Sequence, residues 1–206
     1  MVIEKAFIEY INKHEGIFSI FGKLEFTNKD RIGQGGNGLV YLAKINDKEV
    51  AIKFLISDSE RKKTRFKSEF FNTNYVKNEL CHVVNMIHYD ELLIEETSIP
   101  YIIMSKYSQN LKSFQKNKKE IQREDFLNIV KFLFNSIASI HRKNILHRDI
   151  KPENILVDTD EKFFWQILVL HILRKKIFRL IIKLKKGNVW QILNFLLQSK
   201  SIINMR

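Results

Sequence analysis

The chain has 206 residues, which is enough for one domain with a hydrophobic core or for two small lobes. Its 45% apolar and 28% charged residues exclude a disordered, collagen-like or disulfide-stapled protein. The formal net charge is +12, and the single cysteine, Cys81, excludes an intrachain disulfide and favours a reducing compartment. Glu4 and Glu9 interrupt the apolar pattern at the start, and no stretch reaches about 18 uninterrupted apolar residues. We therefore expect no signal peptide, no spanning helix and a cytoplasmic location.

The positive charge is concentrated near the C-terminus. Residues 162–206 contain ten Lys or Arg and no Asp or Glu, so residues 1–161 hold 25 basic and 23 acidic residues. A nearly neutral body does not favour a nucleic-acid partner. Within the basic segment, the apolar run 163–173 precedes the cations at 174–176, a pattern compatible with an anionic membrane surface. Membrane contact through this tail is therefore a minor alternative.

The first half of the chain predicts strands and one helix. Residues 1–25 are expected as an N-terminal extension, either a regulatory arm or a lead-in to the first strand. Residues 26–53 are rich in β-formers around a glycine-rich turn and a second, shorter turn. A charged helix is expected over 60–76, after a cluster of residues that can cap it. Two further strands are expected over 83–94 and 101–107.

The second half predicts a helical lobe. Glu124 opens a segment whose apolar residues recur at the spacing of a buried helical face. These apolar residues are Phe126, Ile129, Val130, Leu133, Phe134, Ile137 and Ile140. The sequence thus predicts an α+β protein with a strand-rich lobe over 26–107, the start of a helical lobe over 108–161, and a basic apolar tail of doubtful structure over 162–206.

Three glycines carry the first chemical motif. Gly33, Gly35 and Gly38 have a spacing that also serves dinucleotide-binding folds. A dinucleotide fingerprint opens a helix, whereas Gly38 leads into the strand-forming run 39–42. This context favours a glycine-rich hairpin, whose backbone N–H groups can approach phosphate oxygens without a Cβ in the way. For this stretch alone, a plain hairpin is the alternative.

Two charged residues follow the glycine motif. Lys53 stands on a predicted strand, 15 residues after Gly38, and Glu69 lies 16 residues further along, within the predicted helix. A lysine that reaches phosphates from a strand needs a carboxylate to hold its amine in place, and Glu69 is the candidate. Taken alone, a lysine on a strand or a glutamate on a helix more often lies on a solvent-exposed face than in a binding site.

The third motif is H-R-D-x-K-x-x-N at residues 147–154, with the apolar strand 155–157 behind it. Five fixed positions at this spacing would arise by chance in about one of ten thousand such chains. With the glycine hairpin, the strand lysine and the helix glutamate in the same order, residues 26–161 resemble a protein kinase. The resemblance implies a two-lobe kinase-like fold with a strand-rich N-lobe and an incomplete helical C-lobe.

The resemblance also implies roles for individual residues, with ATP and Mg²⁺ as cofactors and a protein substrate as the acceptor. Asp149 would accept the proton of the substrate hydroxyl, and Asn154 would bind Mg²⁺. Lys151 would face the transferred phosphate, as in the serine/threonine branch. Lys53 would hold the α- and β-phosphates and be positioned by Glu69. The other implied nucleotide contacts are Ile32, Gly33, Gly35, Gly38, Val40, Ala51 and Met104, with the backbone of 105–107 as the hinge that binds adenine.

The C-terminal part departs from the kinase pattern. An Asp-Phe-Gly, whose Asp binds Mg²⁺, is expected within 167–171, where the sequence is Ile-Leu-Val-Leu-His. No Asp follows Asp160 and no Pro follows Pro152. Residues 162–206 therefore favour a truncated lobe read out of frame, with a membrane-surface tail or a divergent lobe as alternatives.

The resemblance to protein kinases implies an ATP-dependent serine/threonine protein kinase that transfers the γ-phosphate to protein hydroxyls. Loss of the Asp-Phe-Gly segment and of most of the C-lobe predicts that this chain is impaired in the transfer. The alternative is a catalytically inactive, nucleotide-binding pseudokinase or scaffold. A protein that binds membranes or nucleic acids through its basic tail is the third hypothesis, and the sequence favours it least.

Overall fold

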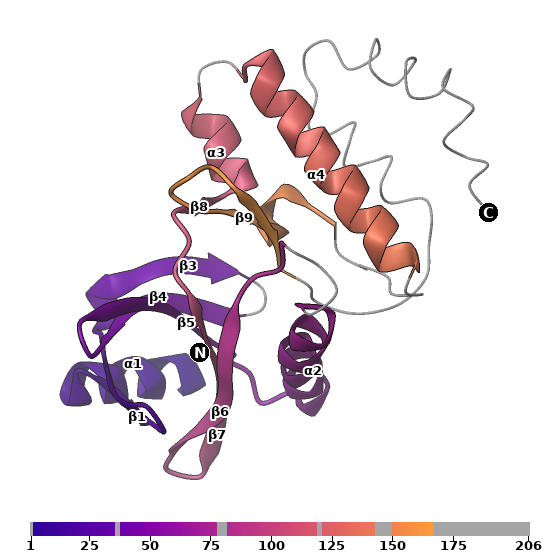
Figure 1. Ribbon diagram of the computed structural model, residues 1–206. Coiled ribbons are helices and arrows are strands. Elements are labelled where there is room, and N and C mark those ends of the chain that lie inside the picture. The colour runs from indigo at the N-terminus through magenta and orange to yellow at the C-terminus, as the bar shows by residue number, and fades with distance from the viewer. Residues whose placement is uncertain (1, 36–37, 78–81, 119–120, 143–149, 167–206) are drawn as a thin grey trace. The chain divides into compact units, whose positions relative to one another are not determined.

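The computed structural model describes residues 2–35, 38–77, 82–118, 121–142 and 150–166, all within one compact unit (Figure 1). These residues form a larger sheet with strand order β1-β2-β4-β5-β7-β6, in which β3 also pairs with β4, and a smaller sheet, β10-β9-β8. The strands are β1 (Gly16–Ser19), β2 (Gly22–Glu25), β3 (Arg31–Gly35), β4 (Gly38–Ile45), β5 (Lys48–Phe54), β6 (Met86–Ile94), β7 (Thr97–Ser105), β8 (Gln109–Asn110), β9 (Ile155–Val157) and β10 (Phe163–Trp165). The helices are α1 (Val2–His14), α2 (Glu60–Lys77), α3 (Leu111–Asn117) and α4 (Arg123–Arg142), with short 3₁₀ turns η1 (Asn28–Asp30) and η2 (Pro152–Asn154). The α+β class expected from the sequence is confirmed.

Strand β5 occupies the middle of the larger sheet. Asn46 and Asp47 join it to β4 with φ angles of 47° and 62°, a left-handed turn that these two residue types tolerate. The antiparallel register then places Lys53 opposite Val40 on β4 and opposite Ile102 on β7. Because β5 is paired on both sides, the position of Lys53 along the strand is held by the sheet itself.

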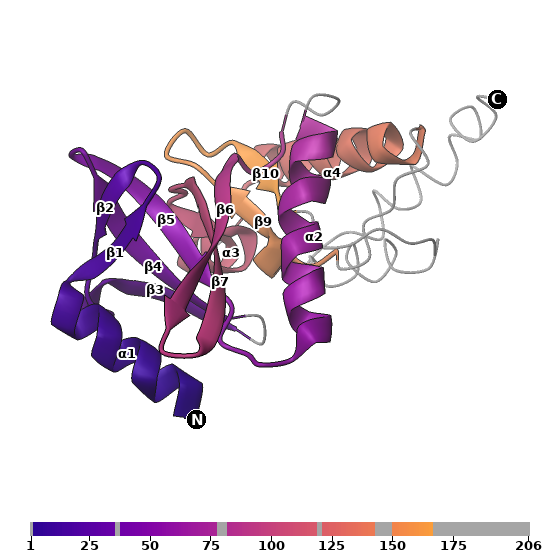
Figure 2. The same ribbon diagram turned by 90° about the horizontal axis from the view of Figure 1, so that it is seen from below.

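The alternation of side chains along β5 separates two chemical environments. Val50, Ile52 and Phe54 belong to a hydrophobic cluster that includes α1, on one face of the sheet. Ala51 points to the other face and packs in a second cluster with residues of α2. Figure 2 shows α1 and α2 on these opposite faces. Lys53 shares the face of Ala51, so its amine points toward α2 and away from the aromatic core.

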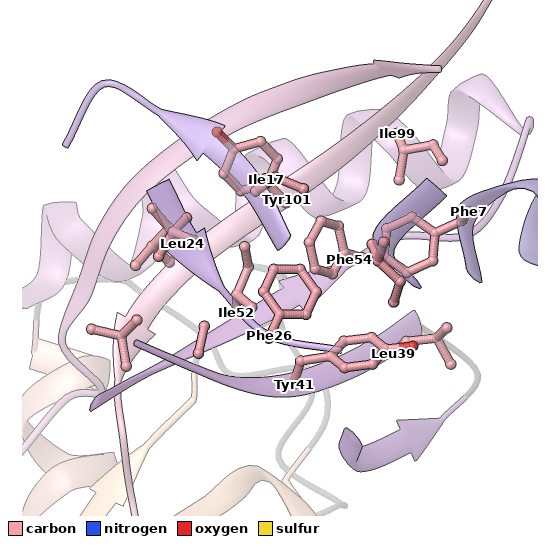
Figure 3. Close-up of a cluster of buried hydrophobic side chains, with 14 of the residues drawn as sticks. Phe7, Ile17, Leu24, Phe26, Leu39, Tyr41, Ile52, Phe54, Ile99 and Tyr101 are labelled. Atoms are coloured by element: carbon pink, nitrogen blue, oxygen red, sulfur yellow. The ribbon is translucent and has the colours of Figure 1, made fainter. Parts of the chain in front are cut away.

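The N-terminal residues are part of the core of the larger sheet. Phe7 and Ile11, one turn apart on α1, are both 0% exposed. The Phe7 ring lies 4.6 Å from the ring of Phe54 and 6.0 Å from that of Tyr41, at one side of an aromatic cluster (Figure 3). The residues expected as an extension, 1–25, therefore belong to the folded sheet. Helix α1 covers the face that Lys53 does not use, and the β1–β2 hairpin continues the larger sheet beside β4.

Replacing Phe7 with alanine is expected to lower the free energy of unfolding by about 3 kcal/mol, because it leaves a cavity among aromatic side chains. Urea unfolding followed by circular dichroism measures this loss. Phe18, which is 77% exposed on β1, supplies the matched control. Phe18→Ala should change the unfolding free energy by no more than about 0.5 kcal/mol. Equal effects of the two substitutions would contradict the assignment of α1 to the core.

Helix α4 confirms the predicted helix and corrects one of its core positions. Ile129, Leu133 and Ile137 are buried, as expected. Phe134 was expected on the same buried face but is 49% exposed, while Ser136 is 9% exposed. The apolar stripe predicted from the sequence is wider than the surface that packs against α4 among the described residues.

Among the residues that the structure describes, no helix is long and apolar enough to cross a membrane.

The smaller sheet corrects the boundary expected at residue 162. Phe163–Trp165, placed by the sequence analysis in a tail of doubtful structure, is strand β10, which pairs antiparallel with β9. Trp165 is 0% exposed, and its ring stacks on that of Phe132 in α4 at 5.6 Å. The alternation of buried Phe163 and Trp165 with the half-buried Phe164 matches a strand with one core face. The remainder of the predicted tail, 167–206, lies outside the described residues.

Candidate active site

A cavity of about 630 Å³ lies between the larger sheet and the smaller one. Its lining includes residues of β3, β4, β5, β7, β8, α3, η2 and β9. Eight of the predicted nucleotide contacts line it, namely Ile32, Gly33, Gly35, Gly38, Val40, Ala51, Lys53 and Met104. Lys151 and Asn154, predicted for catalysis and metal binding, line it as well. The structure thus brings together residues from both predicted lobes around one space.

The glycines of the β3–β4 hairpin serve different purposes. Gly38 has a φ of +125°, and a Cβ added there would lie 1.8 Å from the backbone oxygen of Phe54. Gly38 is therefore required by the backbone of the sheet itself. A Cβ added at Gly35 would meet nothing within 4 Å, so the space beside Gly35 is open. Of these two glycines, Gly35 is the one whose missing side chain leaves room for a ligand.

Lys53 and Glu69 form a buried ion pair at the wall of the cavity. The Lys53 Nζ donates to Glu69 Oε1 at 2.7 Å and to Glu69 Oε2 at 2.9 Å. The two side chains are 8% and 3% exposed. A charge-assisted contact to both carboxylate oxygens holds the amine in one place. The contact that the sequence predicts between Lys53 and Glu69 is therefore present in the structure.

Helix α2 positions the carboxylate of this pair. Phe66, Glu69, Thr73 and Val76 are its buried residues, spaced by three and four so that they share one face. The Phe66 ring lies 5.4 Å from Lys53 Nζ, close enough for a cation–π contact. Because this face of α2 packs against the sheet, the Glu69 carboxylate lies next to the Lys53 amine on β5.

Gln166 is a site residue that the sequence analysis missed. Its Nε2 donates to Glu69 Oε1 at 2.8 Å, and it lines the same cavity. It stands directly before 167–171, where the kinase pattern places Asp-Phe-Gly. No local motif marks it, since its partner is 97 residues away in the sequence.

The predicted hinge connects β7 to β8 along one edge of the cavity. Met104, at the end of β7, is 4% exposed and pairs with Ala51 on β5. The backbone N–H of Asn85 donates to the Tyr107 hydroxyl at 3.0 Å, and the Asn85 side chain donates to Ser105 Oγ at 2.8 Å. These contacts tie the hinge to the segment before β6. Burial raises the pKa of the Tyr107 phenol, so this hydroxyl stays protonated.

Two ion pairs lie at the edge of the cavity, and in each of them a lysine is paired with a glutamate. Lys106 donates to a Glu49 carboxylate oxygen at 2.6 Å, and this hydrogen bond lowers the pKa of Glu49. Lys112 on α3 donates to Glu153 Oε1 at 2.7 Å, which lowers the pKa of Glu153 in the same way. Both carboxylates therefore remain ionised at neutral pH and are partnered by a lysine of this chain.

The third motif, residues 147–154, is described only from residue 150 onward. Asn154 in η2 is 6% exposed, and its backbone N–H donates to the Lys151 oxygen at 3.0 Å. Asp149, the predicted catalytic base, lies outside the described residues. Its place relative to Lys151 and Asn154 is therefore a prediction.

The described residues do not by themselves fit a magnesium ion. Mg²⁺ prefers carboxylate and other oxygen ligands in an octahedral arrangement. Among the described side chains, Glu69 is engaged by Lys53 and Gln166, Glu153 is engaged by Lys112, and Asn154 contributes an amide oxygen at most. Within the same ranges, no group of three or more His, Cys, Asp or Glu side chains is placed to hold a metal.

Comparison with known proteins identifies the family. A model of the protein kinase domain matches residues 26–172, more than half of the chain. The chain belongs to the protein kinase family, as its strand-rich lobe, glycine hairpin and Lys53–Glu69 pair indicate. The match also extends beyond residue 161, where the resemblance in the sequence was expected to end. This agrees with β10, which continues the fold past that point.

The curated relatives are much longer proteins. The serine/threonine-protein kinase PrkC of Bacillus subtilis (strain 168) is 38% identical over 130 residues, which is 62% of this chain and 20% of PrkC. A G-type lectin S-receptor-like serine/threonine-protein kinase of Arabidopsis thaliana, At4g11900, is 31% identical over 160 residues, 73% of this chain and 18% of that protein. The chain thus spans about a fifth of the length of these relatives.

Proposed function

We propose that this chain binds ATP in the cavity between its two sheets and acts within the serine/threonine branch of the protein kinases. The observation that carries the proposal is the buried Lys53–Glu69 pair, which presents a fixed ammonium group to a space of about 630 Å³. A fixed cation beside an open glycine hairpin suits the phosphates of a nucleotide. The names of the relatives support the serine/threonine assignment.

The roles of individual residues follow from their places around the cavity. Lys53 would pair with the α- and β-phosphates, while the backbone of 105–107 would bind adenine beside Met104. Asp149 would accept the proton of the protein hydroxyl as its oxygen forms a bond to the γ-phosphorus and ADP departs. Lys151 would lie beside the transferred phosphate. The family resemblance also implies Mg²⁺, with Asn154 as one of its ligands. Because the described residues do not complete a magnesium site, no step of the transfer is assigned to the metal.

The same proposal includes weak phosphotransfer by this chain. Residues 161–206 contain one acid, Glu161, and no Asp, so the second metal ligand of the kinase pattern is not supplied by that part of the sequence. The alternative is an inactive pseudokinase that binds ATP through Lys53 without turnover. The single cysteine favours a cytoplasmic location, and the proposed acceptor is a protein hydroxyl.

Calorimetric titration of the purified chain with ATP tests the binding step. We expect a dissociation constant of roughly 1 μM–1 mM, the range of ordinary enzyme substrates, with and without Mg²⁺. Asp149→Asn should bind ATP as the unchanged chain does, because the proposed base faces the acceptor hydroxyl. No detectable ATP binding at millimolar nucleotide would overturn the proposed function.

Transfer of a labelled γ-phosphate to casein tests the catalytic step. We expect a rate at least about 100-fold below the usual 1–100 s⁻¹ of protein kinases. A residual rate that disappears in Asp149→Asn would support an impaired kinase, whereas ATP binding with no transfer in either protein would favour the pseudokinase. An ordinary kinase rate would contradict the impairment.

A further inference from the structure

The backbone of Gln166 and of the residue before it is held by hydrogen bonds on both sides. Its N–H donates to the backbone oxygen of Asn154 at 2.9 Å. The preceding residue, Trp165, pairs with Ile155 on β9. On its other side, Trp165 donates to the backbone oxygen of His82 and accepts from the N–H of Val84, both at 2.9 Å. These contacts place Gln166 at a defined point between η2 and residues 82–84, which follow α2 in the chain.

From this point, the side chain of Gln166 reaches Glu69. The amide Nε2 donates to Oε1, the same oxygen that accepts one of the two hydrogen bonds from Lys53. Glu69 is 2% exposed, so water has little access to compete for that oxygen. The carboxylate is therefore oriented by two side chains, Lys53 from the larger sheet and Gln166 from the end of the smaller one.

We propose that Gln166 is a positioning residue that orients Glu69, and through it Lys53, for the phosphates of the nucleotide. This inference rests on the proposed function, because Lys53 is taken to bind phosphate. Gln166 links β10 and the Asn154 backbone directly to α2. The link consists of hydrogen bonds alone and needs no metal ion. It fixes the Lys53 ammonium before any nucleotide enters the cavity.

The test compares ATP with adenosine, which has the same base and ribose but no phosphates. In Gln166→Met the side-chain length is kept and the amide is removed. We expect calorimetry to give about tenfold weaker ATP binding, the effect of losing one hydrogen bond to a charged group, and unchanged adenosine binding. Gln122→Met, which removes a glutamine outside the cavity lining, is the matched control and should leave both affinities unchanged.

A second variant adds a pH dependence that a purely structural role would not produce. In Gln166→Glu at pH 8.5, the new carboxylate repels Glu69, so ATP affinity relative to the unchanged chain at that pH should fall further than in Gln166→Met. At pH 5.5 the new carboxyl binds a proton, since the neighbouring negative charge raises its pKa, and can donate to Glu69 Oε1. Relative ATP affinity should then recover toward that of the unchanged chain.

The outcomes separate this inference from the proposed function. An unchanged chain that does not bind ATP contradicts the proposed function. If the unchanged chain binds ATP and both Gln166 variants bind it equally well, only the positioning role is overturned. Equal weakening of ATP and adenosine binding also overturns it, because that result indicates general damage to the cavity. Thermal unfolding of each variant without ligand shows whether it is folded when measured.

Discussion

Lys53→Met is expected to weaken ATP binding by about 100-fold or more, because two charge-assisted phosphate contacts are lost at about 1.5–3 kcal/mol each. It should also lower the free energy of unfolding by about 3 kcal/mol, since Glu69 would remain buried without its cation. Calorimetry measures the first effect and urea unfolding measures the second. A variant as stable as the unchanged chain would contradict the burial of this charged pair.

The double variant Lys53→Met/Glu69→Gln separates stability from ligand binding. Glutamine at position 69 removes the unpaired charge and keeps an oxygen that can accept from Gln166. We therefore expect about 2 kcal/mol of the lost stability to return, because replacing both members of a buried pair is often close to neutral. ATP binding should stay lost. Recovery of ATP binding in the double variant would show that Lys53 does not contact the phosphates.

Gly38→Ala should destabilise the fold by about 3–5 kcal/mol, because alanine at a φ of +125° is strained and its Cβ would lie 1.8 Å from the Phe54 oxygen. The contacting atom belongs to the backbone of β5, which cannot move without disturbing the sheet. Gly16→Ala is a matched control away from the cavity. Its φ is +129° and its Cβ would lie 1.9 Å from the Leu24 oxygen, so urea unfolding should show a similar loss.

Gly35→Ala tests the ligand side of the same hairpin. Its Cβ would meet nothing within 4 Å, so the free energy of unfolding should change by no more than about 0.5 kcal/mol. ATP affinity should nevertheless fall, by roughly tenfold, because a methyl group keeps the backbone from approaching the phosphates. Unchanged ATP affinity in Gly35→Ala would mean that the phosphates do not lie against this glycine.

Local chemistry along the chain was enough to predict the elements that carry the site. The helix expected over 60–76 is Glu60–Lys77, and the strand lysine of the sequence lies on β5. Such predictions succeed because strand and helix periodicities are local properties. Phe134 shows the limit of the same reasoning. A helical period identifies an apolar stripe, but the neighbouring elements decide which edge of that stripe is covered.

The sequence by itself determined the family, the order of the motifs and the residue types at the candidate site, because these depend on spacing along the chain. Tertiary structure alone decided that Lys53 donates to both carboxylate oxygens of Glu69, that α1 completes the core, and that β10 extends the fold past residue 161. The contact from Gln166 to Glu69 belongs with these. Hydrogen bonds and packing between distant segments depend on how the chain is folded back on itself. No local pattern of residues shows which distant segments will come into contact.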